Sequence, residues 1–230
     1  MINLIKLEFK KNKFGWYSKG LLIANPIILL FICVINYLEM LEGNDVLSSV
    51  NEAFSMLGIL SRVVIIIFAA VLLSKLIIRE YNSNTISVLF TYPVQRKKII
   101  WAKIAIVCGM TFTALLLSQL FLDSAFIIVN HYYNFVPATL DWRLIQSELL
   151  TILVQSLAST GISLIPLYFG LRKKSVTATI VSAVIVGSLL NSNTAGFSLS
   201  SILIIPIILG VIGVAIAYLS FRDVDTTDIV

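Results

Sequence analysis

Side chains that perform acid–base, nucleophilic or metal chemistry are scarce in this sequence. His131 is its one histidine, so a metal centre built from several His and Glu ligands at helical spacing is excluded. The GISLI stretch at Gly161 lacks the second glycine of a G-x-S-x-G serine site and its base. Cys33 and Cys108 fall in separate apolar runs, which is typical of buried thiols. The sequence also contains no G-x-x-x-x-G-K-[ST] phosphate loop. From these observations together, we expect that the chain is not an enzyme and binds neither a metal nor a cofactor.

Two charged residues, Arg62 and Asp123, interrupt apolar runs. A charge at the centre of a bilayer costs about 2.5 to 3.5 kcal/mol even on insertion scales, so each requires a partner, a route to the interface or a function. They can form a structural pair or snorkel to the interface, or they can line a substrate path. Asn25, Gln119 and Gln155 likewise suit either interhelical hydrogen bonds or a cavity wall.

The longest polar stretch in the first half of the chain runs from residue 80 to 98, EYNSNTISVLFTYPVQRKK. On a helical wheel it has an apolar arc of Tyr81, Ile86, Val88, Leu89, Phe90 and Tyr92. Glu80 suits the start of a helix, where the dipole favours an anion, and Pro93 forbids its continuation. The pattern therefore predicts a helix of two to three turns lying along a membrane surface.

Cations follow this stretch at Arg96, Lys97 and Lys98, with Trp101 as an interfacial anchor. A solvated turn that carries stop-transfer cations is the simpler interpretation.

These residues must be positioned by helices in a membrane. The chain has 230 residues, of which 58% are hydrophobic and 13% charged, and its mean hydropathy is +0.97. Such a composition is too apolar for a wetted surface and indicates an integral membrane protein. Apolar runs long enough to cross a hydrocarbon core of about 30 Å are predicted at 20–38, 57–78, 104–128, 149–169, 176–190 and 202–219. The fifth is short, and a re-entrant piece is its alternative.

The cations give the orientation. Of the 17 lysines and arginines, all but Arg62 and Arg143 fall on one side of this six-span arrangement. By the positive-inside rule both termini are cytoplasmic, and an even number of spans gives the same result. The net charge of +5 is then a topology signal and gives no support to a nucleic-acid partner. The stretch from 80 to 98 lies inside, between spans two and three.

Four other segments carry expectations. Residues 1–19 form a basic interfacial helix or a plain topology determinant. Residues 170–175 form a tight turn whose cations fix orientation or make a second, weaker cytoplasmic contact. Residues 191–201 form a plain external loop or part of a re-entrant gate. Residues 220–230 form a frayed cytoplasmic tail.

The pattern between spans two and three resembles that of the permease subunits of type-2 ATP-binding-cassette (ABC) exporters of bacteria. The matching residues are Glu80, Thr85, Leu89, Phe90, Pro93, Arg96 and Lys103, while Asn84 stands where the family commonly has glycine and Gln95 where serine is common. The layout of six spans also resembles that family. The resemblance implies one permease domain, 1–230, in which the stretch from 80 to 98 is a coupling helix that docks on a separate ATPase subunit. The implied coupling residues are Glu80, Thr85, Ile86, Leu89, Phe90, Pro93 and Arg96.

The resemblance also implies partners. Two ATPase subunits would carry ATP and Mg, and a second copy of this chain or a related permease would complete the pore in the plasma membrane. We expect export of an amphipathic substrate, with an antimicrobial or other peptide as the favoured class, for export or self-immunity. A membrane immunity or sensor protein that binds a toxic peptide without pumping is the alternative, and a secondary transporter comes third.

Overall fold

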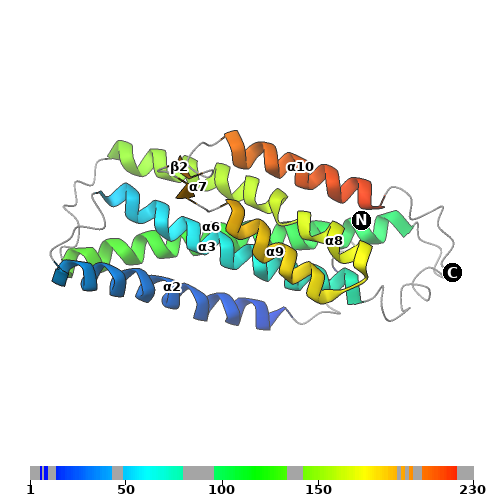
Figure 1. Ribbon diagram of the computed structural model, residues 1–230, viewed down its shortest axis with the longest axis horizontal. Coiled ribbons are helices and arrows are strands. Elements are labelled where there is room, and N and C mark those ends of the chain that lie inside the picture. The colour runs from blue at the N-terminus through cyan, green and yellow to red at the C-terminus, as the bar shows by residue number, and fades with distance from the viewer. Residues whose placement is uncertain are drawn as a thin grey trace.

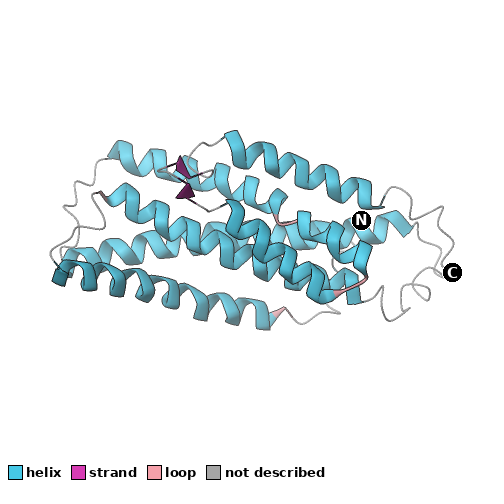
Figure 2. Ribbon diagram, in the orientation of Figure 1, coloured by secondary structure: helices cyan, strands magenta, loops and turns pink. Residues whose placement is uncertain are grey.

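The computed structural model describes residues 6, 8–9, 14–42, 49–79, 96–133, 142–190, 193–194, 197–198 and 204–221. They form an elongated bundle whose helices run roughly along one axis (Figures 1 and 2). Its elements are α2 (Gly15–Glu42), α3 (Val50–Leu73), the π-helix η1 (Ser74–Ile78), α6 (Arg96–Tyr133), α7 (Trp142–Ile162), α8 (Ile165–Lys173), α9 (Val176–Leu190) and α10 (Ile204–Phe221).

The predicted all-helical membrane class is confirmed. Four stretches are long and apolar enough to cross a membrane: Gly15–Leu38, Val50–Ile78, Ile99–Tyr133 and Ile145–Lys173. Two shorter apolar helical stretches, Val176–Leu189 and Ile204–Ser220, accompany them. Because a helix rises about 1.5 Å per residue, the long helices exceed a hydrocarbon core of about 30 Å. In Figure 1, α2, α3, α6 and α7 extend past the shorter α9 and α10 at one end, where α3 and α7 begin; we call this the long-helix end.

Helix α3 is central to the bundle. Ser49 caps its start, because the Ser49 hydroxyl accepts from the Glu52 amide at 3.4 Å. Leu57, Ile65 and Leu72 are fully buried along it, and it packs against α2, α6 and α9. It continues directly into η1, so one long helical element carries both Arg62 and the start of the segment that leads to residue 80.

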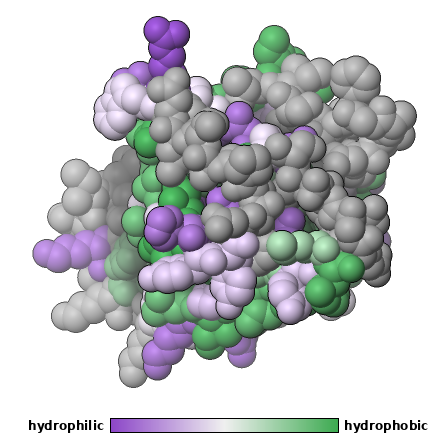
Figure 3. Space-filling view, turned by 90° about the vertical axis from the view of Figure 1, so that its left-hand side faces the viewer, coloured by the Kyte–Doolittle hydropathy of each residue, from purple (hydrophilic) through white to green (hydrophobic). Residues whose placement is uncertain are grey.

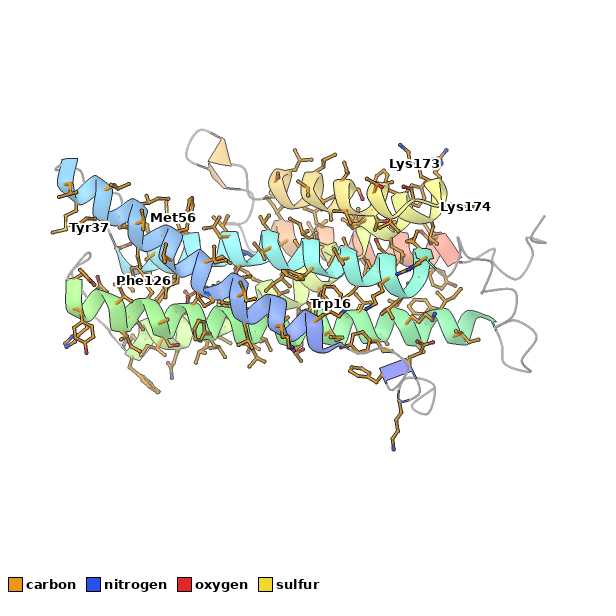
Figure 4. All side chains as sticks on the ribbon, turned by 90° about the horizontal axis from the view of Figure 1, so that it is seen from below. Trp16, Tyr37, Met56, Phe126, Lys173 and Lys174 are labelled. Atoms are coloured by element: carbon orange, nitrogen blue, oxygen red, sulfur yellow. The ribbon has the colours of Figure 1, made fainter. Side chains whose placement is uncertain are left out.

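Helix α2 lies on the outside of the bundle. Leu22 and Leu30 are 72% and 65% exposed, as expected of side chains that face lipid. Its inner face is held by a hydrogen bond from the Asn25 amide to the Ser118 hydroxyl, 3.1 Å long, so Asn25 serves interhelical bonding. Figure 4 shows α2 passing across the bundle from Trp16 at one end to Tyr37 at the other.

Helix α2 begins within the predicted interfacial segment 1–19. Its first residue is Gly15, so residues 15–19 are continuous with the first long helix. The Tyr17 ring packs edge-on against Phe68, 5.7 Å between centroids, and this contact holds that turn against α3. Most of residues 1–13, and the tail from residue 222, lie outside the described residues.

Proline divides the predicted fourth span. The predicted run at 149–169 lies within the apolar helical stretch Ile145–Lys173, in which α7 ends at Ile162 and α8 begins at Ile165. Pro166 lies in the first turn of α8, where the missing amide leaves no hydrogen bond unmade.

The expected turn at 170–175 is also shorter than predicted. Helix α8 runs through Lys173, and the chain reverses at Lys174, which has a left-handed backbone with φ 47°. Gly170 serves packing here, because a Cβ at this position would overlap the Thr179 side chain of α9. Lys173 and Lys174 project away from the bundle at this turn (Figure 4).

The segment at 191–201 contains a small β ladder in its described residues. Strand β1 (Asn193–Thr194) pairs antiparallel with β2 (Phe197–Ser198), with Asn193 opposite Ser198. These four residues are therefore extended, whereas a re-entrant gate would be helical.

Glycines bring α7 and α10 into close contact. A Cβ on Gly161 or Gly213 would overlap backbone atoms of the other helix, and a Cβ on Gly210 would lie 2.8 Å from the Ala158 carbonyl oxygen. Small residues let helix backbones approach where apolar side chains gain nothing by leaving lipid. This contact fixes the position of α7, which carries one wall of the cavity described next.

Candidate functional site

The predicted coupling residues fall almost entirely outside the described part of the chain. Residues 80 to 95 are not described, and this range includes Glu80, Thr85, Ile86, Leu89, Phe90 and Pro93. Arg96 is the first residue of α6. The structure describes the helical segments that flank the loop, η1 before it and α6 after it.

Arg62 lies in α3, one turn after Gly58, and is 9% exposed. Its Nε donates to the Gly58 carbonyl at 2.9 Å. Its Nη1 donates to the Gln155 side-chain oxygen on α7, which joins the two helices. Among the described residues Nη2 makes no hydrogen bond, and it lies 3.6 Å from where a Cβ of Gly58 would stand. The guanidinium therefore keeps donors for another group.

Asp123 lies in α6 and is 7% exposed. Its Oδ1 accepts from the Gln119 amide at 2.8 Å, and the same amide lies 3.4 Å from the Phe54 carbonyl. Its Oδ2 has no partner among the described residues. No direct ion pair joins Asp123 to Arg62 in the described chain, although both belong to one polar cluster in which Gln119 stands between them.

These residues border a polar cavity of about 280 Å³ between α3, α6 and α7. Its lining residues are Phe54, Ser55, Gly58, Ile59, Ser61, Arg62, Leu115, Gln119, Glu148, Thr151, Ile152, Gln155 and Ser156. We call this cavity the Arg62 cavity. Figure 3 views the molecule from the long-helix end, where hydrophilic and hydrophobic residues are interspersed.

The helices place opposite charges at two depths of the Arg62 cavity. Glu148 lies seven residues before Gln155 in α7, a rise of about 10 Å toward the long-helix end. Glu148 is half-buried, whereas Arg62 and Ser61 are buried deeper along α3. Ser61 is 1% exposed, and its hydroxyl has no partner among the described residues. The cavity therefore has a carboxylate toward its mouth and a guanidinium at its floor, a pattern suited to binding a charged group.

Sequence reasoning placed Glu148 in an outer loop and did not connect it with Arg62. The signal was the spacing of Glu148, Thr151 and Gln155, which puts three polar residues on one face of α7. Gln119 and Gln155 were predicted to make interhelical bonds or to line a cavity, and both uses are observed.

A second buried cation, Lys103 of α6, lies toward the opposite end of the bundle and is 3% exposed. Its Nζ donates to the Leu76 carbonyl in η1 at 2.9 Å and lies 3.7 Å from a Glu8 carboxylate oxygen. A π-helical turn loosens the regular carbonyl ladder, and here a lysine from the next span engages one of its carbonyls. We call this arrangement the Lys103 tie; it joins the N-terminal segment, η1 and α6.

Another cation stabilises the same region. Lys75 of η1 lies over the Trp16 ring of α2, with 5.1 Å from Nζ to the ring centroid. Lys75 lies near the end of the predicted run 57–78, from where its long side chain can reach the interface.

A second hollow in the bundle is apolar. It is a groove of about 910 Å³ between α6, α7 and α10, and its lining includes Trp101, Phe112, Leu157 and Val211. Its chemistry suits hydrocarbon and contrasts with that of the Arg62 cavity. Within the described residues no group of His, Cys, Asp or Glu suited to hold a metal ion occurs.

Comparison with known proteins assigns this helical bundle to a family. The family described as ABC-2 family transporter protein matches the chain over residues 4–191. The protein YcbO of Bacillus subtilis (strain 168), itself described as uncharacterized, is 41% identical over 227 residues, which cover 99% of this chain and 100% of YcbO. No solved structure matches. The chain is a multi-pass membrane protein, consistent with the plasma membrane, and it belongs to the ABC-2 family of transporter proteins.

Proposed function

We propose that this chain is the permease of an ATP-driven exporter and that its loop 80–98 is the element gripped by a separate ATPase subunit. The observation that carries the proposal is the family match, which spans residues 4–191 and so includes the loop and the helices on both sides of it. The topology proposed with it has six spans and both termini in the cytoplasm. The long-helix end then faces outward, and the Lys103 tie lies near the cytoplasmic surface.

The structure around the loop supports a mechanical role. The loop leaves from η1 and returns as α6, and the Lys103 tie joins these two flanks. A force applied to the loop by a closing ATPase pair would therefore reach α3 and α6 together. Because α3 and α6 both line the Arg62 cavity, the same motion would act on the cavity walls. The proposed assembly has two ATPase subunits, which hold ATP and Mg, and two permeases.

The proposed cargo is amphipathic. The proposed class is an antimicrobial or other peptide, which is exported or expelled for self-immunity. The Arg62 cavity, at about 280 Å³, accommodates a polar group of such a molecule.

Co-expression with a candidate ABC ATPase subunit tests the coupling proposal. The wild type should co-purify with the ATPase in detergent, and the Leu89→Asp, Phe90→Asp double variant should lose the ATPase because it places two charges on the apolar face of the loop. Ser87→Asp is the matched control, since it adds a charge to the polar face of the same helix and should retain the complex. Glu80→Arg should keep or weaken assembly while uncoupling ATP hydrolysis from transport.

Two results would overturn the proposal. One is a double variant that assembles and transports as the wild type does. The other is cysteine labelling that places Ser83 outside the cell. Peptide protection of cells that does not depend on any ATPase would favour the non-pumping immunity function.

A further inference from the structure

We propose that the Arg62 cavity binds a zwitterionic group, with its anionic part at Arg62 and its ammonium part at Glu148. The chemistry is that of a phosphoethanolamine or an amino acid, supplied either by a phospholipid-type headgroup or by a free small molecule. The idea that the bound group is transported cargo rests on the permease function proposed above. The binding itself does not depend on that function.

The floor of the cavity favours an anion. Arg62 uses Nε and Nη1 for protein partners, while Nη2 makes no hydrogen bond among the described residues. The Ser61 hydroxyl, 1% exposed, is also without a partner there. A buried donor without an acceptor, such as the Ser61 hydroxyl, is costly, and a phosphate or carboxylate oxygen would accept from Ser61 and add a charge-assisted bond to Arg62.

The mouth of the cavity favours a cation. Glu148 lines the cavity and interacts electrostatically with Arg62, although no direct ion pair between them occurs among the described residues. The two charges therefore face the same space without touching. An ammonium near Glu148 and an anion near Arg62 complete both pairs, whereas a purely anionic ligand would meet the carboxylate and a purely cationic one the guanidinium.

The cavity volume limits the size of the ligand. At about 280 Å³ the cavity holds the equivalent of about nine water molecules of ~30 Å³ each. A headgroup or a single amino-acid residue fits, and a whole amphipathic peptide does not. The apolar side chains of Phe54, Leu115 and Ile152 in the lining accommodate the carbon atoms next to the charged groups.

Native mass spectrometry of the purified full-length chain tests the proposal without any ATPase. The chain in detergent is offered equal amounts of phosphatidylethanolamine, phosphatidylglycerol and, separately, free phosphoethanolamine. The wild type should retain phosphatidylethanolamine about tenfold more than phosphatidylglycerol, the factor expected for one charge-assisted interaction. Retention of free phosphoethanolamine alone would assign the site to a soluble zwitterion, and retention of the lipid alone would assign it to a headgroup.

Three variants separate the two charges from the cavity volume. Arg62→Gln should lose all retention, and Glu148→Gln should keep binding but lose the preference for the ethanolamine lipid over the glycerol lipid. Thr151→Leu fills the cavity with every charge intact and should also lose retention, so the test does not depend on Arg62→Gln alone. Arg143→Gln, on the exposed face of α7, is the matched control and should bind as the wild type does.

A wild type that does not discriminate between the two lipids, or an Arg62→Gln or Thr151→Leu chain that retains phosphatidylethanolamine as the wild type does, would overturn the proposal. Because this assay involves no nucleotide, its failure leaves the coupling experiment unaffected, and a failed coupling experiment leaves this result unaffected.

Discussion

The Arg62 cavity and the Lys103 tie each contain a cation buried in the same helical bundle, but the groups around the two cations differ. Arg62 is 9% exposed and Lys103 is 3% exposed, so burial alone does not separate them. Arg62 borders a cavity and keeps donors that no described residue engages. Lys103 contacts a backbone carbonyl and a carboxylate from two other segments of the chain.

This difference indicates which charge serves architecture and which serves a ligand. A buried ammonium that contacts a carbonyl and a carboxylate has its charge compensated by the protein. Removing this ammonium therefore destabilises the fold. A guanidinium that borders a polar cavity can share its charge with a bound group, so its loss is felt by whatever enters that cavity. If the loop couples to an ATPase as proposed, the position of the tie beside η1 would also make it the part of the bundle that meets force from the loop.

The largest effect is expected at the tie. Lys103→Met should destabilise the chain by about 3 to 5 kcal/mol, because it removes the buried ammonium that contacts the Glu8 carboxylate and the Leu76 carbonyl. Size-exclusion profiles and melting curves in detergent measure this loss. Adding Glu8→Gln to Lys103→Met should recover part of it, and Lys173→Met at the exposed α8–α9 turn should cost nothing measurable. Additive losses in the double variant would show that the two residues are not coupled.

A smaller effect is expected where α7 is held by α10. Gly161→Ala should destabilise the chain by about 1 to 3 kcal/mol, because its new Cβ meets the backbone of Gly210 and pushes the two helices apart. It should also weaken ligand retention, because α7 carries Glu148 and Gln155. Gly109→Ala in α6 has open space around its Cβ and is the matched control. Its melting temperature should equal or exceed that of the wild type.

The smallest effect is expected at the second contact of η1. Trp16→Leu removes the ring beneath Lys75 and should cost about 0.5 to 1 kcal/mol, the range of an exposed cation–π pair. Chemical denaturation of the purified chain resolves a change of this size. Trp142→Leu, at a 68% exposed position at the start of α7, should leave the midpoint unchanged. Equal losses in both tryptophan variants would argue that general interfacial anchoring, and not Lys75, is responsible.

Much of the fold followed from the sequence because membrane helices must satisfy their own backbone groups within apolar runs. The run predicted at 176–190 coincides with α9, and the run predicted at 149–169 lies within the apolar helical stretch Ile145–Lys173. The ends of the longer helices were underestimated, because α6 continues through polar residues at both ends, from Arg96 to Tyr133. An apolar run shows which part of a helix lies in lipid. It does not show how far the helix continues beyond the hydrocarbon core.

The sites were less predictable than the spans. Arg62 and Gln155 are 93 residues apart in the chain, and Lys103 and Leu76 are 27 apart, so both contacts depend on how neighbouring helices align. Periodicity within one helix carries no information about that alignment. The π-helical turn at η1 has no local sequence signal that we recognise, and Glu148 acquires its role only when α7 packs beside α3.

The unfolding free energies of Arg62→Gln and Lys103→Met, measured side by side with the wild type in one detergent, test the contrast most directly. The two roles predict that Arg62→Gln costs no more than about 1 kcal/mol, since water in the cavity replaces the lost hydrogen bonds, while Lys103→Met costs about 3 kcal/mol or more. An Arg62→Gln chain that is destabilised as much as Lys103→Met would contradict the assignment of one cation to a ligand and the other to the fold.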